Sequence, residues 1–363
     1  MLFRSQKEMI EVPGSDGPLQ IGVIKIPKFY IDFDAMRKGD ADYKSTTRDV
    51  RNLLDELVAD GAQGIVIDLR NNGGGSLQEA NDLTGLFIEY GPTVQIRHSS
   101  SKVFRDGKRL RSTYYEGPLA VLINRLSASA SEIFAGAIQD YRRGVVVGTQ
   151  SFGKGTVQTL LPLTDGQLKL TESKFYRISG DSTQHRGVIP DVEFPSLFDK
   201  EEIGESALDY ALSWDQINPV RHKQYHDLDA ILPALADMFS ERAKVDPDLV
   251  YLEEQVDFVS EVSDIDSVSL REETRMALRE ERRQRSLDLE NKRRSAKGLP
   301  PIEADAIDAE DEDEGENGPE SDFDSSEVIL GEAGRILVDS ILLQNQRFIA
   351  DVLKRAPAAE STN

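Results

Sequence analysis

The chain has 363 residues, enough for two or three domains, and 39% of them are hydrophobic, as expected of a globular protein. Its formal net charge of −22 argues against nucleic acid as the main partner, because phosphate binding needs clustered positive charge. The absence of cysteine excludes thiol catalysis, disulfides and cysteine-based zinc sites. No run of about 18 apolar residues occurs, so we expect no integral membrane span.

The first half of the sequence predicts alternating strands and helices. Residues 19–33 alternate in polarity and predict a strand that ends near Pro27, whereas the continuous apolar run 64–69 predicts a strand buried on both faces. A loop rich in Asn and Gly, residues 71–75, follows that run. This alternation indicates an α/β domain with a largely parallel or mixed sheet, ending near residues 192–195. Apolar spacing predicts further helices at 46–62, 77–90 and 129–141 and further strands at 94–96, 119–123, 145–147 and 156–161.

The second half of the sequence predicts helices and one acidic segment. Asp246 and Pro247 are residue types favoured at the N-cap and the first position of a helix. Residues 303–327 contain 13 acidic residues and no Lys or Arg, which is typical of a solvated linker. The predicted helices cover 207–212, 228–245, 247–259, 268–297 and 326–355. We therefore expect a core at 1–195, a helical extension at 196–300, an acidic disordered linker at 301–325 and a last helix and tail at 326–363.

A serine cluster at residues 127–131 opens one predicted helix, and Lys154 lies between two glycines further along the chain. A serine at the start of a helix, a lysine between glycines and no nearby histidine or cysteine suggest a serine nucleophile activated by a lysine base. A lysine can act as a base only where it is desolvated, and apolar residues flank Lys154 on both sides. Free N–H groups at a helix start favour an oxyanion, so Ala130 is one candidate donor and the loop 73–75 offers a second.

The segments that carry this chemistry resemble one protease family. Residues 126–135, 139–141 and 152–158 look like the tail-specific, or carboxy-terminal processing, serine proteases. Residues 68–75 and 184–191 resemble the other motif blocks of that family. The similarity covers nearly the whole chain, because the Arg- and Glu-rich helix and the acidic region resemble the C-terminal extension of the bacterial periplasmic members.

The resemblance implies a role for each matching residue. The nucleophile of the family falls on Ser129 and its lysine base on Lys154, while Gln158 matches the glutamine that orients the lysine. Asp140 matches an aspartate treated as catalytic, yet it lies eleven residues after Ser129 on one predicted helix, about 16 Å away. Support of helix packing is therefore the alternative to a catalytic role for Asp140.

The resemblance also implies a fold, a set of partners and a compartment. It implies a ClpP/crotonase-like α/β catalytic core, followed by a mostly helical C-terminal extension, that needs no metal and no organic cofactor. We expect the N–H groups of Gly75 and Ala130 to hold the oxyanion. The implied substrates are unfolded or tagged proteins that are cleaved near their C-termini, and the implied compartment is the periplasm.

The N-terminal part of the chain departs from the family pattern. Members carry a signal peptide, an N-terminal helical region and a PDZ domain before the core, and residues 1–20 are too few for these. The first seven residues also lack the apolar h-region of a signal peptide. The chain looks like the C-terminal portion of such a protease, so a separate N-terminal or PDZ half, or an adaptor protein, is a candidate partner. The alternative function is a catalytically silent, truncated fragment that acts as a binding or scaffolding module.

Other interpretations of the same residues are weaker. The segment 148–154 satisfies most of a phosphate-binding loop, but Gly155 stands where Ser or Thr should hold magnesium, and a predicted strand follows in place of a helix. The four histidines suggest a Ser-His-Asp triad, but no Gly-x-Ser-x-Gly elbow occurs. His222 and His226 have the spacing of helical metal ligands, but their segment is polar and lacks the glutamate of that motif. The serines, the glycines and Gln158 also have structural explanations, as a helix cap, a flexible turn and a strand residue.

Overall fold

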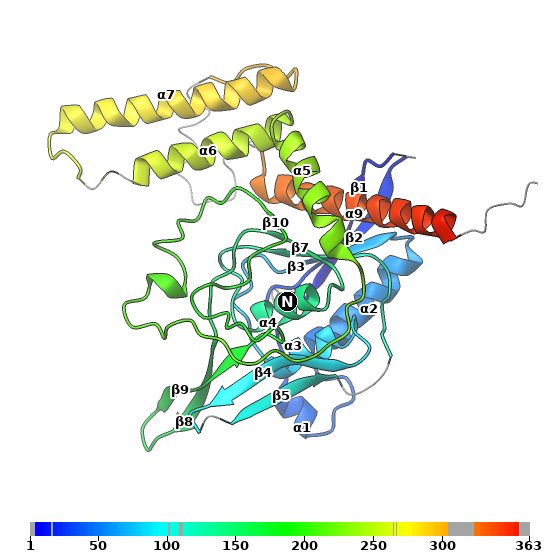
Figure 1. Cartoon of the computed structure of the whole chain (residues 1–363). Helices are drawn as coiled ribbons and strands as arrows, with labels where there is room; N and C mark the ends of the chain where they lie inside the picture. The colour runs from blue at the N-terminus through cyan, green and yellow to red at the C-terminus, as the bar shows by residue number, and fades with distance from the viewer. Residues whose placement is uncertain are drawn as a thin grey trace, which may run out of the picture. The chain divides into compact units, whose positions relative to one another are not determined.

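The computed structural model of the chain describes residues 4–15, 17–100, 102–108, 112–263, 265, 267–303 and 323–355 (Figure 1). They belong to two compact units. The core unit comprises residues within 1–194, 200–236 and 331–363, and the helical unit comprises residues within 195–199 and 237–330. The division into four segments stays a prediction, and most of the expected acidic linker, residues 304–322, lies outside the described residues.

A six-stranded sheet forms the centre of the core unit (Figure 1). Its strand order is β1 (Gln6–Val12), β2 (Leu19–Lys25), β3 (Gly64–Asp68), β6 (Leu119–Ile123), β7 (Val145–Gly148) and β10 (Val192–Glu193). β1 pairs antiparallel with β2, and all the other neighbours are parallel. Every residue of β3, β6 and β7 is buried, which explains their continuous apolar sequences. The carboxyl ends of these parallel strands share one edge of the sheet, so the loops that follow them meet there.

In the part of the chain that the structure describes, the first two hundred residues form four helices, α1 (Phe33–Arg37), α2 (Thr46–Ala59), α3 (Leu77–Thr84) and α4 (Ala130–Asp140). All except α1, which has no buried residue, bury apolar faces in the same core. α4 connects β6 to β7 and is buried over residues 130–139. Its Phe134 ring contacts Phe29 and Phe87, with ring centroids 6.5 and 5.8 Å apart. Because β6 and β7 are parallel, α4 starts at the carboxyl edge of the sheet and returns the chain to the opposite edge.

A second sheet is antiparallel and has four strands. Its strand order is β5 (Val103–Lys108), β4 (Gly91–His98), β9 (Gln167–Tyr176) and β8 (Thr156–Pro162). Two of these strands, β8 and β9, follow the loop that leaves the carboxyl edge after β7. All its neighbours are antiparallel, and β8 forms an edge of the sheet. β8 begins two residues after Lys154, so this sheet fixes the direction in which the chain leaves the lysine.

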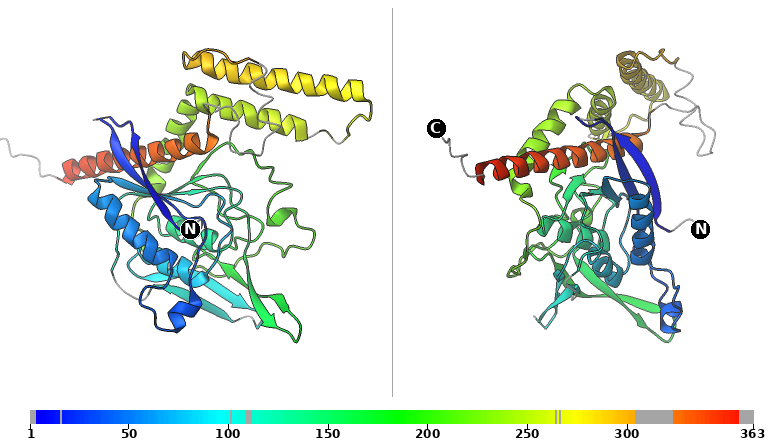
Figure 2. Two further views of the ribbon diagram at one scale, coloured as in Figure 1. Left: turned by 180° about the vertical axis from the view of Figure 1, so that it is seen from behind. Right: turned by 90° about the vertical axis from the view of Figure 1, so that its right-hand side faces the viewer.

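The C-terminal part of the chain is helical. Its helices are α5 (Leu232–Ala243), α6 (Pro247–Ser263), α7 (Glu272–Ala296) and α9 (Ser325–Arg355), of which α5 and α9 have residues in both units. Figure 2 shows α6 and α7 lying side by side, and Arg285 and Lys292 of α7 pair with Glu261 and Glu254 of α6. In the described part of the chain, no helix combines the length and the apolar character that crossing a membrane requires.

The observed elements confirm the predicted fold class, an α/β core followed by a helical C-terminal part. The predicted strands 64–69, 119–123 and 145–147 agree with the structure within a residue, and so does helix 129–141. The Asp246 cap is also confirmed, since Asp246 Oδ1 accepts the N–H of Asp248 at 3.0 Å.

Two predicted helices are wrong in extent. The helix predicted at 207–212 is only a 3₁₀ turn at Glu205–Ala207, because Leu208 and Leu212 are about half exposed and no core surface stabilises a longer helix there. The helix predicted at 77–90 ends at Thr84, after which the Leu86 carbonyl accepts the N–H of Tyr114 at 2.8 Å. The pattern also failed to predict β1, β5 and β9, whose exposed polar residues obscure any strand periodicity.

Candidate active site

The carboxyl edge of the main sheet brings Ser129 and Lys154, two of the predicted site residues, to neighbouring loops. Ser129 ends the loop after β6, and Lys154 lies in the loop after β7. The β6 loop is hydrogen-bonded on both sides, since Ala128 donates to the Asn72 carbonyl and Phe152 donates to the Ser127 carbonyl, each at 3.0 Å. The loops after β3, β6 and β7 therefore form one hydrogen-bonded group, and the β6 loop, which carries Ser129, lies in the middle of it.

Ser129 has a backbone conformation that few serines adopt. Its φ and ψ are 58° and −110°, at the sharp turn between β6 and α4. Such a conformation costs on the order of 1–3 kcal/mol for a residue with a Cβ, and it persists only where the surrounding structure enforces it. Ser129 is half-buried, whereas Ser127 and Ser131 are fully buried and donate their hydroxyls to the Leu69 and Asn72 carbonyls, each at 2.8 Å. Of the three serines, Ser129 is thus the one that a substrate can reach.

Two backbone N–H groups beside Ser129 have no acceptor among the described residues, namely those of Gly75 and Ala130. The Gly74 carbonyl accepts the N–H of Phe29 at 3.1 Å, and because the peptide is planar and trans, the N–H of Gly75 points away from Phe29. Gly74 itself lies against the serine, since a Cβ on it would be 2.8 Å from Ser129 Cβ. The geometry thus leaves both N–H groups that were predicted to hold the oxyanion free to donate.

The carboxylate of Glu132, in the first turn of α4, connects the serine and lysine segments. Its Oε2 accepts the N–H of Ser129 at 2.7 Å and that of Lys154 at 2.9 Å, so the two backbone nitrogens cannot be farther apart than these two hydrogen bonds together. Its Oε1 accepts the N–H of Gly153 at 2.7 Å and the Ser151 hydroxyl at 2.6 Å. Burial raises the pKa of Glu132 to about 7, against the opposing effect of these hydrogen bonds.

Sequence reasoning assigned no role to Glu132. A signal was present, because an acid three residues after a serine at a helix start is the pattern of a capping box. The pattern accounts for the bond to the N–H of Ser129. It does not account for the three bonds to residues 151–154, which only the folded chain brings next to the carboxylate.

Lys154 and Gln158 lie four residues apart, on either side of the start of β8. Lys154 Nζ donates to Gln158 Oε1 at 3.4 Å. The register of β8 against β9 shifts between Val157 and Gln158, and such an irregularity re-aims a side chain. The loop is packed tightly, since the N–H of Gly155 donates to Gln184 Oε1 at 2.9 Å. Gln158 is exposed and Lys154 is half-buried, so both side chains can be reached from solvent.

Asp140 lies at the far end of α4 from Ser129. Its carboxylate is nearly buried and pairs with the Arg177 guanidinium, and it also accepts the N–H of Ser179 at 3.3 Å. Its backbone carbonyl contacts His222 Nε2 at 2.9 Å. Asp140 is therefore separated from the other predicted site residues by the length of the helix, and it connects α4 to the residues that follow β9.

The phosphate-loop and metal-site interpretations find no support in this geometry, whereas Ser129 does cap α4 and Gln158 does lie in strand β8. After Lys154 the chain continues as strand β8, not as the helix that a phosphate-binding loop requires. His222 contacts two backbone carbonyls, those of Val220 and Asp140. Among the described residues, no group of three or more His, Asp or Glu side chains could hold a metal ion.

Comparisons with known proteins agree with one another. Residues 20–194 match the model of peptidase family S41, and residues 198–342 match that of the C-terminal domain of tail specific protease. The tail-specific protease of Haemophilus influenzae is 36% identical over 344 residues, which are 91% of this chain and 46% of the relative. The carboxy-terminal-processing protease of Bartonella bacilliformis is 38% identical over 195 residues, which are 49% of this chain and 44% of the relative.

The chain spans about half the length of the curated relatives that it matches. Among solved structures, a photosystem II D1 C-terminal processing protease is 28% identical, with a TM-score of 0.43 over 55% of this chain and 50% of the other.

Proposed function

Because the chain belongs to the tail-specific proteases of peptidase family S41, we propose that it is a serine endopeptidase that cleaves protein substrates near their C-termini with a Ser129–Lys154 dyad. The observation that carries this proposal is the junction at Glu132. One buried carboxylate bonds the backbone of both Ser129 and Lys154, and two free N–H groups lie beside the serine. A nucleophile, a base and an oxyanion site are the parts that acyl transfer needs.

The proposed reaction begins with the neutral Lys154 amine. Ser129 Oγ attacks the scissile carbonyl carbon while Lys154 Nζ takes the hydroxyl proton, and the N–H groups of Gly75 and Ala130 stabilise the oxyanion that forms. When the tetrahedral intermediate collapses, the C–N bond breaks and Lys154 gives its proton to the leaving amine. Lys154 then takes a proton from water, and the hydroxide attacks the acyl carbon. When this second tetrahedral intermediate collapses, the bond to Ser129 Oγ breaks, Lys154 returns its proton to Oγ, and the product carboxylic acid leaves. Gln158 orients the lysine through the contact between Nζ and Oε1.

Two carboxylates act through other groups in this proposal. Glu132 positions the serine turn and the lysine loop relative to each other, since it accepts hydrogen bonds from both. Asp140 is a positioning residue, because its ion pair with Arg177 holds the end of β9, the strand that pairs with β8. These assignments require neither carboxylate to touch the substrate.

The test is cleavage of an unfolded protein with an apolar C-terminus, compared between the parent chain and the variants Ser129→Ala and Lys154→Ala. We expect a loss of about 10³-fold or more in each variant. The matched controls are Ser100→Ala and Lys169→Ala, at exposed positions away from the junction, and both should cleave at the parent rate. Equal activity in parent and Ser129→Ala protein would contradict the assignment of the nucleophile.

Because the chain matches only about half the length of its curated relatives, a second candidate function is that of a catalytically silent fragment that acts as a binding or scaffolding module. The same assay separates the two, because this candidate predicts no cleavage by the parent chain. If cleavage appears only after an N-terminal or PDZ half, or an adaptor, is supplied, that protein is the proposed partner. The resemblance to bacterial tail-specific proteases is also the basis for proposing a periplasmic location.

A further inference from the structure

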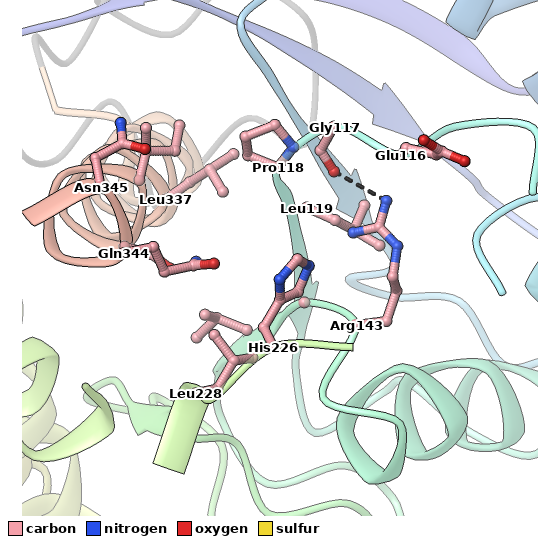
Figure 3. A pocket seen from close by; sticks show the side chains of 14 residues that line it. Glu116, Gly117, Pro118, Leu119, Arg143, His226, Leu228, Leu337, Gln344 and Asn345 are labelled. Atoms are coloured by element: carbon pink, nitrogen blue, oxygen red, sulfur yellow. Dashed lines mark hydrogen bonds between the residues drawn. The ribbon is translucent and has the colours of Figure 1, made fainter. Parts of the chain in front are cut away.

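A pocket of about 130 Å³ lies in the core unit, at the edge of the main sheet opposite to Ser129 (Figure 3). Leu119 and Val145, the first residues of β6 and β7, line one side of it, and residues 337–345 of α9 line the other. The volume is several times the roughly 30 Å³ that one water molecule occupies in the liquid. It therefore has room for a small organic molecule.

Arg143 carries the charge of this pocket. Its side chain is buried, with Nε donating to the Phe87 carbonyl at 2.9 Å and Nη2 donating to the carbonyls of Tyr115 and Gly117 at 2.8 and 2.9 Å. Its Nη1 has no hydrogen-bond partner, and Arg143 pairs with no carboxylate, among the residues that the structure describes. The Tyr115 ring lies beside the guanidinium as well, with its centroid 5.9 Å from Arg143 Cζ. A buried cation without a paired carboxylate is costly, because charges withdrawn from water normally acquire a counter-charge.

The other groups around the pocket supply only part of that counter-charge. Glu116 is the acid among its lining residues, and its charge opposes the lowering of the Arg143 pKa by burial. However, Glu116 is exposed, and its Oε1 accepts the Thr113 hydroxyl at 2.7 Å instead of pairing with Arg143. Burial, and then the charge of Arg143, lower the pKa of His226, so the ring is neutral at pH 7. The pocket is therefore positive, in a chain whose formal net charge is −22.

The remaining lining is apolar on one side and polar at the rim. Gln344 points into the pocket toward His226 (Figure 3), and its Nε2 donates to the Ser340 hydroxyl at 2.9 Å. The aliphatic side chains that close the pocket are those of Leu119, Leu228, Leu337 and Ile341. A cation with a free donor beside aliphatic walls matches an anion that has a short hydrocarbon part better than it matches a fully hydrated inorganic ion.

We propose that this pocket binds a small carboxylate that bears a short aliphatic group. A carboxylate oxygen accepts the hydrogen bond of Arg143 Nη1 after the side chains that cover this buried atom move aside, and the aliphatic group packs against the leucines. Such a group occurs both in free short-chain acids and in the C-terminal residue of a peptide. The proposal does not depend on the chemistry at Ser129, since the two sites lie at opposite edges of the sheet.

The first test uses butyrate as the probe and butyramide, its neutral counterpart, as the control. Because the chain has four histidines, the His226 ring resonances can be assigned with the variant His226→Gln. We expect butyrate to raise the thermal midpoint and to shift the His226 signals, since a nearby anion favours the protonated ring. If butyramide has the same effects as butyrate, the pocket does not recognise the carboxylate, and if neither ligand has any effect, it binds neither; each result would overturn the proposal.

Matched variants on α9 locate the binding without disturbing Arg143. Gln344→Glu introduces an acid that faces the pocket, and Gln346→Glu introduces the same charge at an exposed position that does not line it. We expect butyrate affinity to fall about ten-fold or more in the first variant and to stay unchanged in the second. Equal affinity in the two variants would overturn the assignment of the site.

Two further probes distinguish the source of the carboxylate. A short peptide ending in leucine is compared in its free-acid and amide forms, alongside butyrate. Binding of the peptide acid but not the amide identifies the C-terminal residue of a polypeptide as the occupant. Binding of butyrate without either peptide identifies a free small acid, and binding of no acid contradicts the proposal.

Discussion

The two ends of α4 each hold one buried charged side chain, and they differ in how completely the described chain satisfies it. At the first turn, Glu132 accepts three backbone N–H groups and one hydroxyl. Just beyond the last turn, Arg143 donates to three carbonyls but leaves Nη1 without a partner among the described residues. A buried group with all its hydrogen bonds fixes the structure around it, whereas a buried group that lacks one indicates a place for a ligand. In our proposals, the first end of α4 supports the chemistry at Ser129 and the second end binds a ligand.

The largest effect is expected from Glu132→Gln. Each carboxylate oxygen accepts two hydrogen bonds, so either orientation of the amide sets its NH₂ group against two donors. We expect kcat to fall by about 100-fold, which corresponds to about 2.7 kcal/mol, with little change in KM, because Glu132 does not touch substrate. The control is Glu79→Gln, another buried glutamate in the first turn of a core helix, which bonds Thr47 instead. It should lose stability and keep its kcat; an equal fall in kcat in both variants would contradict the positioning role.

The pH dependence of stability tests the same group. The folded pKa of Glu132, about 7, lies above its ordinary value of 4.5, so the folded state binds the proton more tightly than the unfolded state does. The stability that Glu132 contributes to the folded state is therefore fully present below pH 4.5 and is lost as the pH rises through 7. In denaturant unfolding across this pH range, the free energy of unfolding of the parent should decline as the pH rises. The decline should be weaker in Glu132→Gln. Parallel curves for the two proteins would argue against a raised pKa.

The next largest loss of activity is expected where the loop after β3 packs on Ser129. Gly74 has φ of +97°, and a Cβ there would lie 2.7 Å from the Ala128 carbonyl and 2.8 Å from Ser129 Cβ. Gly166 has a similar φ of +91° but open space around it, so Gly166→Ala isolates the backbone strain, about 1 kcal/mol. We expect Gly74→Ala to lower kcat about ten-fold or more and Gly166→Ala to leave it unchanged. If both variants behave alike, contact with the serine turn is not what requires glycine at position 74.

The smallest effect is expected at the far end of the helix. Asp140→Asn weakens the ion pair with Arg177, and we expect a loss in kcat of several-fold, to about ten-fold, through displacement of β9 and β8. A double-mutant cycle with Arg177→Gln should show strong coupling, so that the double variant is little worse than either single variant. Additive losses would mean that Asp140 acts without Arg177 and would favour a direct catalytic role.

Much of the first end of α4 could be predicted from the sequence. The apolar runs of β3, β6 and β7 identify buried parallel strands, and parallel strands bring their following loops to one edge. The serine cluster and the lysine between glycines could be recognised because they lie in short contiguous segments. Glu132 was visible as part of a capping box, but its bonds to the lysine loop depend on the folded chain.

The second end of α4 could not be predicted in this way. Arg143 and Gln344 are about 200 residues apart in the sequence, and only the packing of α9 on the sheet brings them to one pocket. An unsatisfied donor also has no sequence pattern, because it is defined by the acceptors that are missing around it. The polar strand β9 was not predicted either, since its stability comes from pairing with β4 and β8 and not from an apolar face.

The most direct test of the Ser129–Lys154 dyad is labelling with a fluorophosphonate, followed by mass-spectrometric mapping of the adduct. The dyad mechanism predicts a single modified serine, Ser129, in the parent chain, with fluoride as the leaving group. It predicts no label in Ser129→Ala and labelling slowed by about 10³-fold or more in Lys154→Ala. Label on Ser127 or Ser131, or undiminished labelling of Lys154→Ala, would contradict it.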